Sequence, residues 1–157
     1  MSEKKYVSKA AALDKLQRYC VYQDRCHQEV RSKLLDLGIY GDDLEQIIVA
    51  LIEDNFLNEE RFARSFARGK FRFKRWGRMR IRRELKRRAI SDYCLRKGME
   101  EIEEAEYQRV LYEVVEKKWA GTKAPNDFQR RSKVAQYVIN RGFESALVWE
   151  ILREFGE

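Results

Sequence analysis

Residues 30–48, VRSKLLDLGIYGDDLEQII, decide the fold class of this 157-residue chain. Apolar side chains stand at helical spacing before and after a glycine, Gly38, which is followed directly by Ile39. A glycine in this position is typical of the left-handed residue that ends a helix. The pattern therefore predicts two helices joined by a tight turn.

The same pattern occurs twice more along the chain. Residues 81–99 and 134–152 repeat the apolar positions at offsets of 51 and 53 residues. Gly142 again precedes the turn in the last copy, whereas the middle copy has Ala89 there. With one helix before each copy, we predict an all-α protein of three tandem three-helix repeats that form an elongated, curved array. We expect the repeats to span residues 1–57, 58–103 and 104–157.

The composition is typical of a soluble helical protein. Hydrophobic residues make up 44% of the chain, and a single proline leaves little room for the turns of a β-sandwich. The longest apolar run, residues 47–52, is too short to cross a bilayer, and the N-terminus lacks the apolar stretch of a signal peptide. Three cysteines, an odd number, argue against a disulfide framework. We therefore expect a cytoplasmic protein that has no membrane partner.

The net charge of +7 comes from one segment. Residues 61–88 contain fourteen Lys/Arg and one acid, Glu84, whereas the rest of the chain carries 19 basic and 25 acidic residues. An acidic run follows at 100–106. A concentrated positive field favours a polyanion or an acidic protein surface as partner, because a solvated helix face normally mixes both signs.

Helical periodicity, at about 100° per residue, arranges the cations of this segment into two ridges on adjoining helices. The predicted binding residues are Arg61, Arg64, Arg68, Arg72, Arg75, Arg78, Arg80, Arg83 and Arg87. The core-facing side of the first helix is expected to hold Phe62, Phe66, Gly69 and Phe73, with Gly69 allowing close helix approach. Phe71 points outward in this arrangement, so Phe71 and Trp76 are candidates for stacking on bases, with core packing as the alternative for both.

No constellation of catalytic or metal-binding residues is visible. The only histidine, His27, lies near Cys20 and Cys26, but a C-x5-C-H spacing is not that of a zinc site. Neither a GxxxxGK[ST] phosphate loop nor a GxGxxG turn occurs. We predict a protein that is not an enzyme and that uses no metal and no cofactor.

Several separated motifs stand in a fixed order along the chain. They are Glu29-Val30-Arg31 in an ELR-like segment, NEERFARSF at 58–66, a glycine followed by I-x2-EL-x4-I at 77–90, and Arg141-Gly142-Phe143. Together they resemble the signature of the RecX family of regulatory proteins over nearly the whole chain. Two mild departures are Asn58, where aspartate is common, and Ala89, where glycine is common.

This resemblance implies a modulator of the RecA recombinase built from three three-helix repeats. Members of the family bind the helical groove of the RecA filament on single-stranded DNA, inhibit strand exchange and ATP hydrolysis, and promote filament disassembly. The arginine-rich centre would then face DNA phosphates, an acidic RecA surface, or both. We expect a monomer whose partners are the RecA filament and single-stranded DNA.

Two other classes of function fit the same residues. A general single- or double-stranded DNA-binding protein would use the arginine ridge without RecA, and the near absence of Asn and Gln on the ridge favours contacts to the DNA backbone. A structural adaptor would instead pair its acidic run with the basic centre inside the chain, which would neutralise the positive patch.

Overall fold

The computed structural model describes residues 7–156, which form nine helices and, within that range, no strand. The helices are α1 Lys9–Tyr22, α2 His27–Asp36, α3 Gly41–Glu53, α4 Glu59–Lys74, α5 Arg78–Arg87, α6 Asp92–Met99, α7 Glu104–Ala120, α8 Asp127–Asn140 and α9 Ser145–Leu152. The all-α prediction is confirmed.

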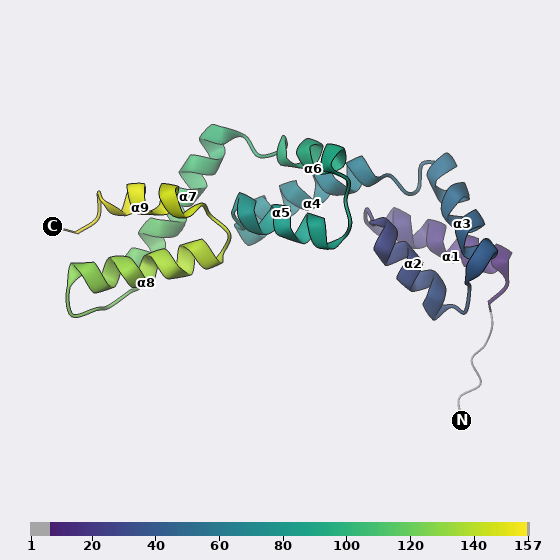
Figure 1. Cartoon of the computed structure of the whole chain (residues 1–157), viewed down its shortest axis with the longest axis horizontal. Helices are drawn as coiled ribbons and strands as arrows, with labels where there is room; N and C mark the ends of the chain where they lie inside the picture. Colours follow the sequence, from purple (N-terminus) through teal and green to yellow (C-terminus); the bar gives the residue numbers. More distant parts are fainter. Residues whose placement is uncertain (1–6, 157) are drawn as a thin grey trace, which may run out of the picture.

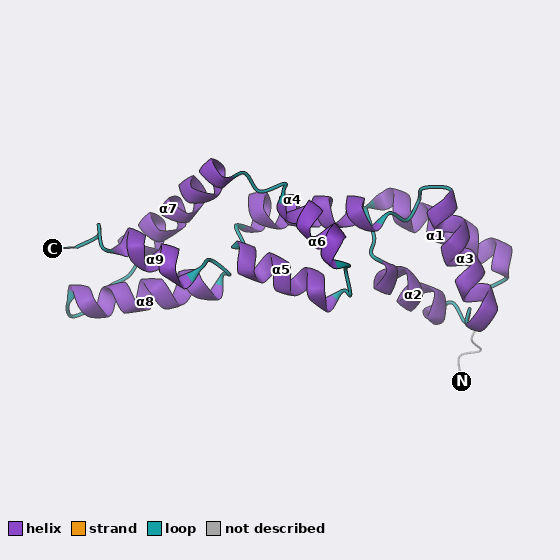
Figure 2. Cartoon of the chain, turned by 45° about the horizontal axis from the view of Figure 1, so that its top comes forward, coloured by secondary structure: helices purple, strands orange, loops and turns teal. Residues whose placement is uncertain are grey.

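The helices follow one another as three groups in an elongated row (Figure 1). Helices α1–α3 lie at one end, α4–α6 in the middle and α7–α9 at the other end, and a second view keeps this order (Figure 2). The row has the tandem arrangement that the repeated pattern predicts. The residue boundaries given above for the three repeats stay a prediction.

Each copy of the repeated pattern turns at a residue with a left-handed backbone. These residues are Gly38 (φ +81°), Ala89 (φ +55°) and Gly142 (φ +104°). In the first copy the N–H of Ile39 donates to the carbonyl oxygen of Leu34 at 2.9 Å, and the middle copy repeats this bond. Glycine adopts the conformation freely, whereas the Cβ of Ala89 makes it costlier by roughly 1 kcal/mol.

Two hydrophobic cores stabilise the row. The first lies within α1–α3 and its connection to α4, and it contains Ala12, Leu16, Cys20, Val30, Leu34, Ile39, Leu44, Ile47, Ile48, Leu51 and Leu57. The second is continuous from α4 to α9. At its centre the ring of Tyr107 lies 5.8 Å from that of Phe71 and 5.4 Å from that of Phe143. The second and third groups therefore share a core, to which Cys26 of the first group also contributes.

Helix α4 turns a different face to the core from the one expected. Phe62 is buried as predicted and Phe66 is half-buried against the core. Phe71, however, is 1% exposed and Phe73 is 85% exposed. The predictions that Phe71 points outward and that Phe73 faces the core are both wrong.

Small side chains explain the orientation of α4. Ala63 and Ala67 are fully buried, and α6 crosses α4 at Gly98, where an added Cβ would lie 2.7 Å from the carbonyl oxygen of Ala63. Gly69 was expected to permit such an approach, but a Cβ there would meet nothing within 4 Å. The close approach exists, and it lies at Gly98. The face of α4 that carries Ala63 and Ala67 therefore packs against α6, and the aromatic side chains of α4 lie to one side of this contact.

Alanine substitutions at the two glycines should change stability in opposite directions. Gly98→Ala should lower the free energy of unfolding by about 1–3 kcal/mol, because the new methyl group must displace backbone. Gly69→Ala should raise it by about 0.5–1 kcal/mol, because alanine is the better helix former and meets no neighbour. Urea unfolding followed by circular dichroism measures both. A Gly98→Ala protein as stable as the unsubstituted chain would contradict the close crossing of α4 and α6.

Candidate nucleic-acid interface

Most of the predicted arginine ridge is paired with acids of the same chain. Within residues 7–156, six of the nine arginines form ion pairs: Arg61–Asp24 (2.7 Å), Arg64–Glu101 (3.2 Å), Arg68–Glu101 (3.4 Å), Arg75–Glu113 (3.0 Å), Arg78–Glu144 (2.5 Å) and Arg87–Glu84 (3.2 Å). The acidic run at 100–106 supplies part of these partners. Intramolecular pairing, the feature expected of an adaptor, thus neutralises part of the ridge.

Arg61 links α4 to the first helix group. Its Nε donates to a carboxylate oxygen of Asp24 at 2.7 Å. Its Nη2 donates to the backbone carbonyl oxygens of Asn55 at 3.1 Å and Phe56 at 3.0 Å. With three hydrogen bonds inside the chain, Arg61 acts as an anchor of the joint between the first and second groups.

Arg78 lies in a junction between the second and third groups. Its Nη2 and Nε donate to one carboxylate oxygen of Glu144, at 2.5 and 3.0 Å, and its Nη1 donates to Glu104 at 2.6 Å. The guanidinium also lies 3.8 Å from the ring centroid of Tyr107. The Tyr107 hydroxyl donates to Glu144 and accepts from the backbone N–H of Arg78 at 3.2 Å. Burial, reinforced by the bond to Glu144, raises the pKa of Tyr107, so its hydroxyl stays a donor.

Two glycines bring the backbones of these groups into direct contact beside Arg78. The N–H of Gly77 donates to the carbonyl oxygen of Arg141, and that of Met79 donates to Gly142, both at 2.9 Å. A Cβ on Gly77 would lie 2.2 Å from the carbonyl carbon of Gly142. The start of α5 is therefore fixed on the turn between α8 and α9.

Three predicted arginines, Arg72, Arg80 and Arg83, form no ion pair within the described part of the chain, and Arg72 and Arg83 are exposed. Arg82 and Lys86, two exposed neighbours outside the predicted ridge, extend Arg83 into a cationic surface on α5. We call Arg82, Arg83 and Lys86 the α5 face. The signal for Lys86 was present in the sequence, since Lys86, like Arg83, lies on the side of the helical wheel away from the core-facing Ile81 and Leu85.

Trp76, the second stacking candidate, is half-buried among cations. The Arg80 guanidinium lies 4.0 Å and the Lys70 ammonium 4.9 Å from its ring centroid. Phe66 packs edge-on at 6.3 Å. Base stacking by Trp76 stays a prediction, and a base there would have to displace a cation, whereas the burial of Phe71 excludes it from any such contact.

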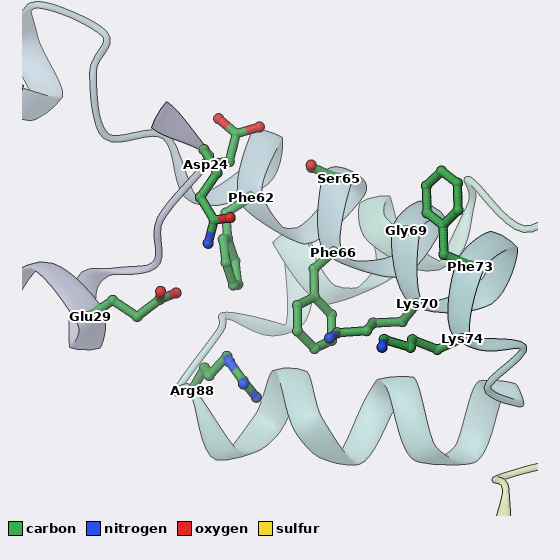
Figure 3. Close-up of a pocket in the computed structure, with 11 residues that line it drawn as sticks. Asp24, Glu29, Phe62, Ser65, Phe66, Gly69, Lys70, Phe73, Lys74 and Arg88 are labelled. Atoms are coloured by element: carbon green, nitrogen blue, oxygen red, sulfur yellow. The ribbon is translucent and has the colours of Figure 1, made fainter. Parts of the chain in front are cut away.

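A cleft of about 390 Å³ lies where the first group meets α4 and α5 (Figure 3). Its charged lining residues are Asp24, Glu29, Lys70, Lys74 and Arg88. In Figure 3 the side chains of Lys70 and Lys74 extend between α4 and α5, whereas Phe73 points away from them. The cleft mixes both charge signs, so the α5 face suits a polyanion better.

Within residues 7–156, no group of three or more His, Cys, Asp or Glu side chains is placed to hold a metal ion. In the same range, no helix is long and apolar enough to cross a membrane. The three cysteines are free thiols, and burial raises the pKa of Cys26 to about 11, so this thiol remains protonated at neutral pH.

The row of three-helix groups, with a cationic surface on α5, defines a helical-repeat protein. Family models described as the second and third three-helix domains of RecX match residues 58–99 and 104–152, which together make up more than half of the chain. The regulatory proteins RecX of Salmonella typhimurium and Salmonella typhi are each 29% identical over 158 residues, covering 94% of this chain and 93% of the relative.

Two crystal structures share the fold. RecX from Lactobacillus salivarius matches with a TM-score of 0.78 and 21% identity, covering 93% of this chain and 95% of that one. A second regulatory protein RecX matches with a TM-score of 0.83 and 20% identity, covering 94% and 73%. The chain belongs to the RecX family of regulatory proteins. This membership confirms the predicted class of function, a regulatory protein of the RecX family that is not an enzyme.

The ion pairs predict that Arg78 is needed for stability. Arg78→Gln should lower the free energy of unfolding by roughly 1–3 kcal/mol, because Glu144 and Glu104 lose their partner in a half-buried junction. Arg83→Gln, the matched control on the same helix, should change it by less than about 0.5 kcal/mol. Thermal unfolding followed by circular dichroism distinguishes the two, and equal melting temperatures would remove the structural role assigned to Arg78.

Proposed function

We propose that this chain binds the RecA filament on single-stranded DNA as a monomer in the cytoplasm and inhibits strand exchange and ATP hydrolysis. The match to regulatory RecX proteins over 94% of the chain carries the proposal. An elongated row of helices supports it, because such a shape can follow a filament surface over several subunits.

The α5 face supplies the contact surface in this proposal. Arg82, Arg83 and Lys86 are exposed and take part in no ion pair within the described residues, so binding breaks no bond of the fold. Arginine forks pair with phosphate and carboxylate alike, which suits either DNA or an acidic surface of RecA. Contacts to phosphate or carboxylate groups do not distinguish one base from another, so we expect binding that is independent of DNA sequence.

A general DNA-binding protein is the second candidate, and the same unpaired cations favour it. The two functions differ in stoichiometry, because a filament regulator acts on many RecA subunits whereas a competitor must cover the DNA. The deciding experiment titrates this protein into RecA that hydrolyses ATP on an excess of single-stranded DNA. We expect inhibition at a small fraction of the RecA concentration. No inhibition, together with salt-sensitive DNA binding, would favour the general DNA-binding protein.

Charge reversal on the α5 face should weaken inhibition strongly without unfolding the protein. Arg82→Glu combined with Arg83→Glu should raise the concentration needed for half-inhibition by roughly tenfold or more, because two cations become repulsive. Helical content should stay unchanged, since both side chains are exposed.

Lys15→Glu combined with Arg96→Glu is the matched control, because it changes the net charge equally at exposed positions of α1 and α6 that form no ion pair within the described chain. An equal loss of inhibition in the α5 variant and in this control would mean that net charge alone drives binding. Full inhibition by the α5 variant would show that this face is not the contact surface.

A further inference from the structure

A second cationic surface lies mainly on the third helix group, and five of its six cations come from outside the basic segment at 61–88. A hollow of about 610 Å³ opens between α7, α8 and the end of α4, and its charged lining residues are Arg75, Lys117, Lys118 and Arg141. An adjoining hollow of about 460 Å³ adds Lys123 and Lys133. No acid lines either hollow. We call these six cations the α7–α8 patch.

Internal bonds position the two arginines of the patch. Arg141 donates to the backbone carbonyl oxygen of Lys74 and lies 5.7 Å from the ring centroid of Tyr137. Arg75 is held by Glu113 at 3.0 Å, and Glu113 also binds Arg109 at 3.1 Å, so this carboxylate is already shared.

The lysines of the patch are not neutralised within the described chain. The ammonium of Lys118 lies 4.2 Å above the ring of Tyr137, and that of Lys133 donates to the backbone carbonyl oxygen of Lys123 at 3.4 Å. Lys117 and Lys123 are exposed and take part in no ion pair. Several like charges around an open hollow repel one another, and an external anion would relieve this repulsion.

The composition of the patch distinguishes between two classes of anionic partner. Lysine is depleted in protein–protein interfaces relative to the rest of the surface, whereas Lys and Arg together are the common contacts to phosphate oxygens. Four of the six cations are lysines. Both cations near Tyr137 lie within cation–π distance of its ring, which leaves that ring poorly placed to stack on a base. The chemistry therefore favours the sugar–phosphate backbone and disfavours base recognition.

We propose that the α7–α8 patch is a binding site for the phosphodiester backbone of a nucleic-acid strand. Binding there requires no recombinase and no residue of the α5 face. The site would let the third helix group hold DNA while the α5 face contacts a different part of a filament or of the same strand. Sequence-independent, salt-sensitive affinity follows from contacts to phosphate alone.

The test measures binding to a fluorescent oligothymidylate by anisotropy, in the absence of RecA, over a series of salt concentrations. Lys117→Gln combined with Lys118→Gln should weaken binding roughly tenfold at low salt. The slope of log affinity against log salt should become less steep by about 1.4, since each lost phosphate contact removes about 0.7. Lys15→Gln combined with Arg96→Gln removes the same net charge elsewhere and should leave the slope unchanged.

Each outcome decides the site independently of the RecA proposal. An unchanged slope in the Lys117/Lys118 variant, or an equal change in the control, would overturn the site. So would a variant that binds DNA normally but no longer inhibits RecA, because the patch would then contact protein. If the slope changes as expected while the unsubstituted protein fails to inhibit RecA, the phosphate site stands and the proposed function fails. Matching circular dichroism melts exclude unfolding as the cause.

Discussion

The backbone contact between Gly77 and Gly142 is the constraint on which the rest of the structure depends. No Cβ fits at Gly77, so only glycine lets the start of α5 donate directly to the carbonyls of the α8–α9 turn. This approach encloses the Tyr107 ring in the shared core and places Arg78 on Glu144. The continuous core from α4 to α9 follows from it, whereas the first group keeps a largely separate core.

The same contact decides which cations are free to bind a partner. It occupies Arg78 at the junction between groups, and it brings Arg141 to the end of α4, beside Arg75. Residues far apart in the sequence thereby join Lys117 and Lys118 in one patch. The segment with the most cations in the sequence is therefore not the same as the surface with the most unpaired cations. The most basic segment supplies both the anchors of the fold and the unpaired cations of the α5 face.

The fold could be predicted from the sequence because its signals are local. Helical spacing and a turn residue at Gly38, Ala89 and Gly142 recur within short stretches, and each can be recognised without knowing the rest of the structure. The candidate interface could not be predicted in the same way, because Glu101 lies 37 residues from Arg64 and Glu144 lies 66 residues from Arg78. The error at Phe71 and Phe73 has a related cause. Periodicity defines the faces of a helix, but a distant small residue, Gly98, determines which face is buried.

The paired arginines differ in how readily they can exchange partners. Arg64 and Arg68 share Glu101 through single long bonds on a partly exposed surface, where an ion pair contributes only about 0–1 kcal/mol. A phosphate or an external carboxylate can replace Glu101 at little cost. Arg78 has two carboxylates, an aromatic ring and a half-buried position, so releasing it would disrupt the junction itself. Intramolecular pairing and partner binding are thus compatible in one segment, because the strongly held cations maintain the fold and the weakly held ones remain available.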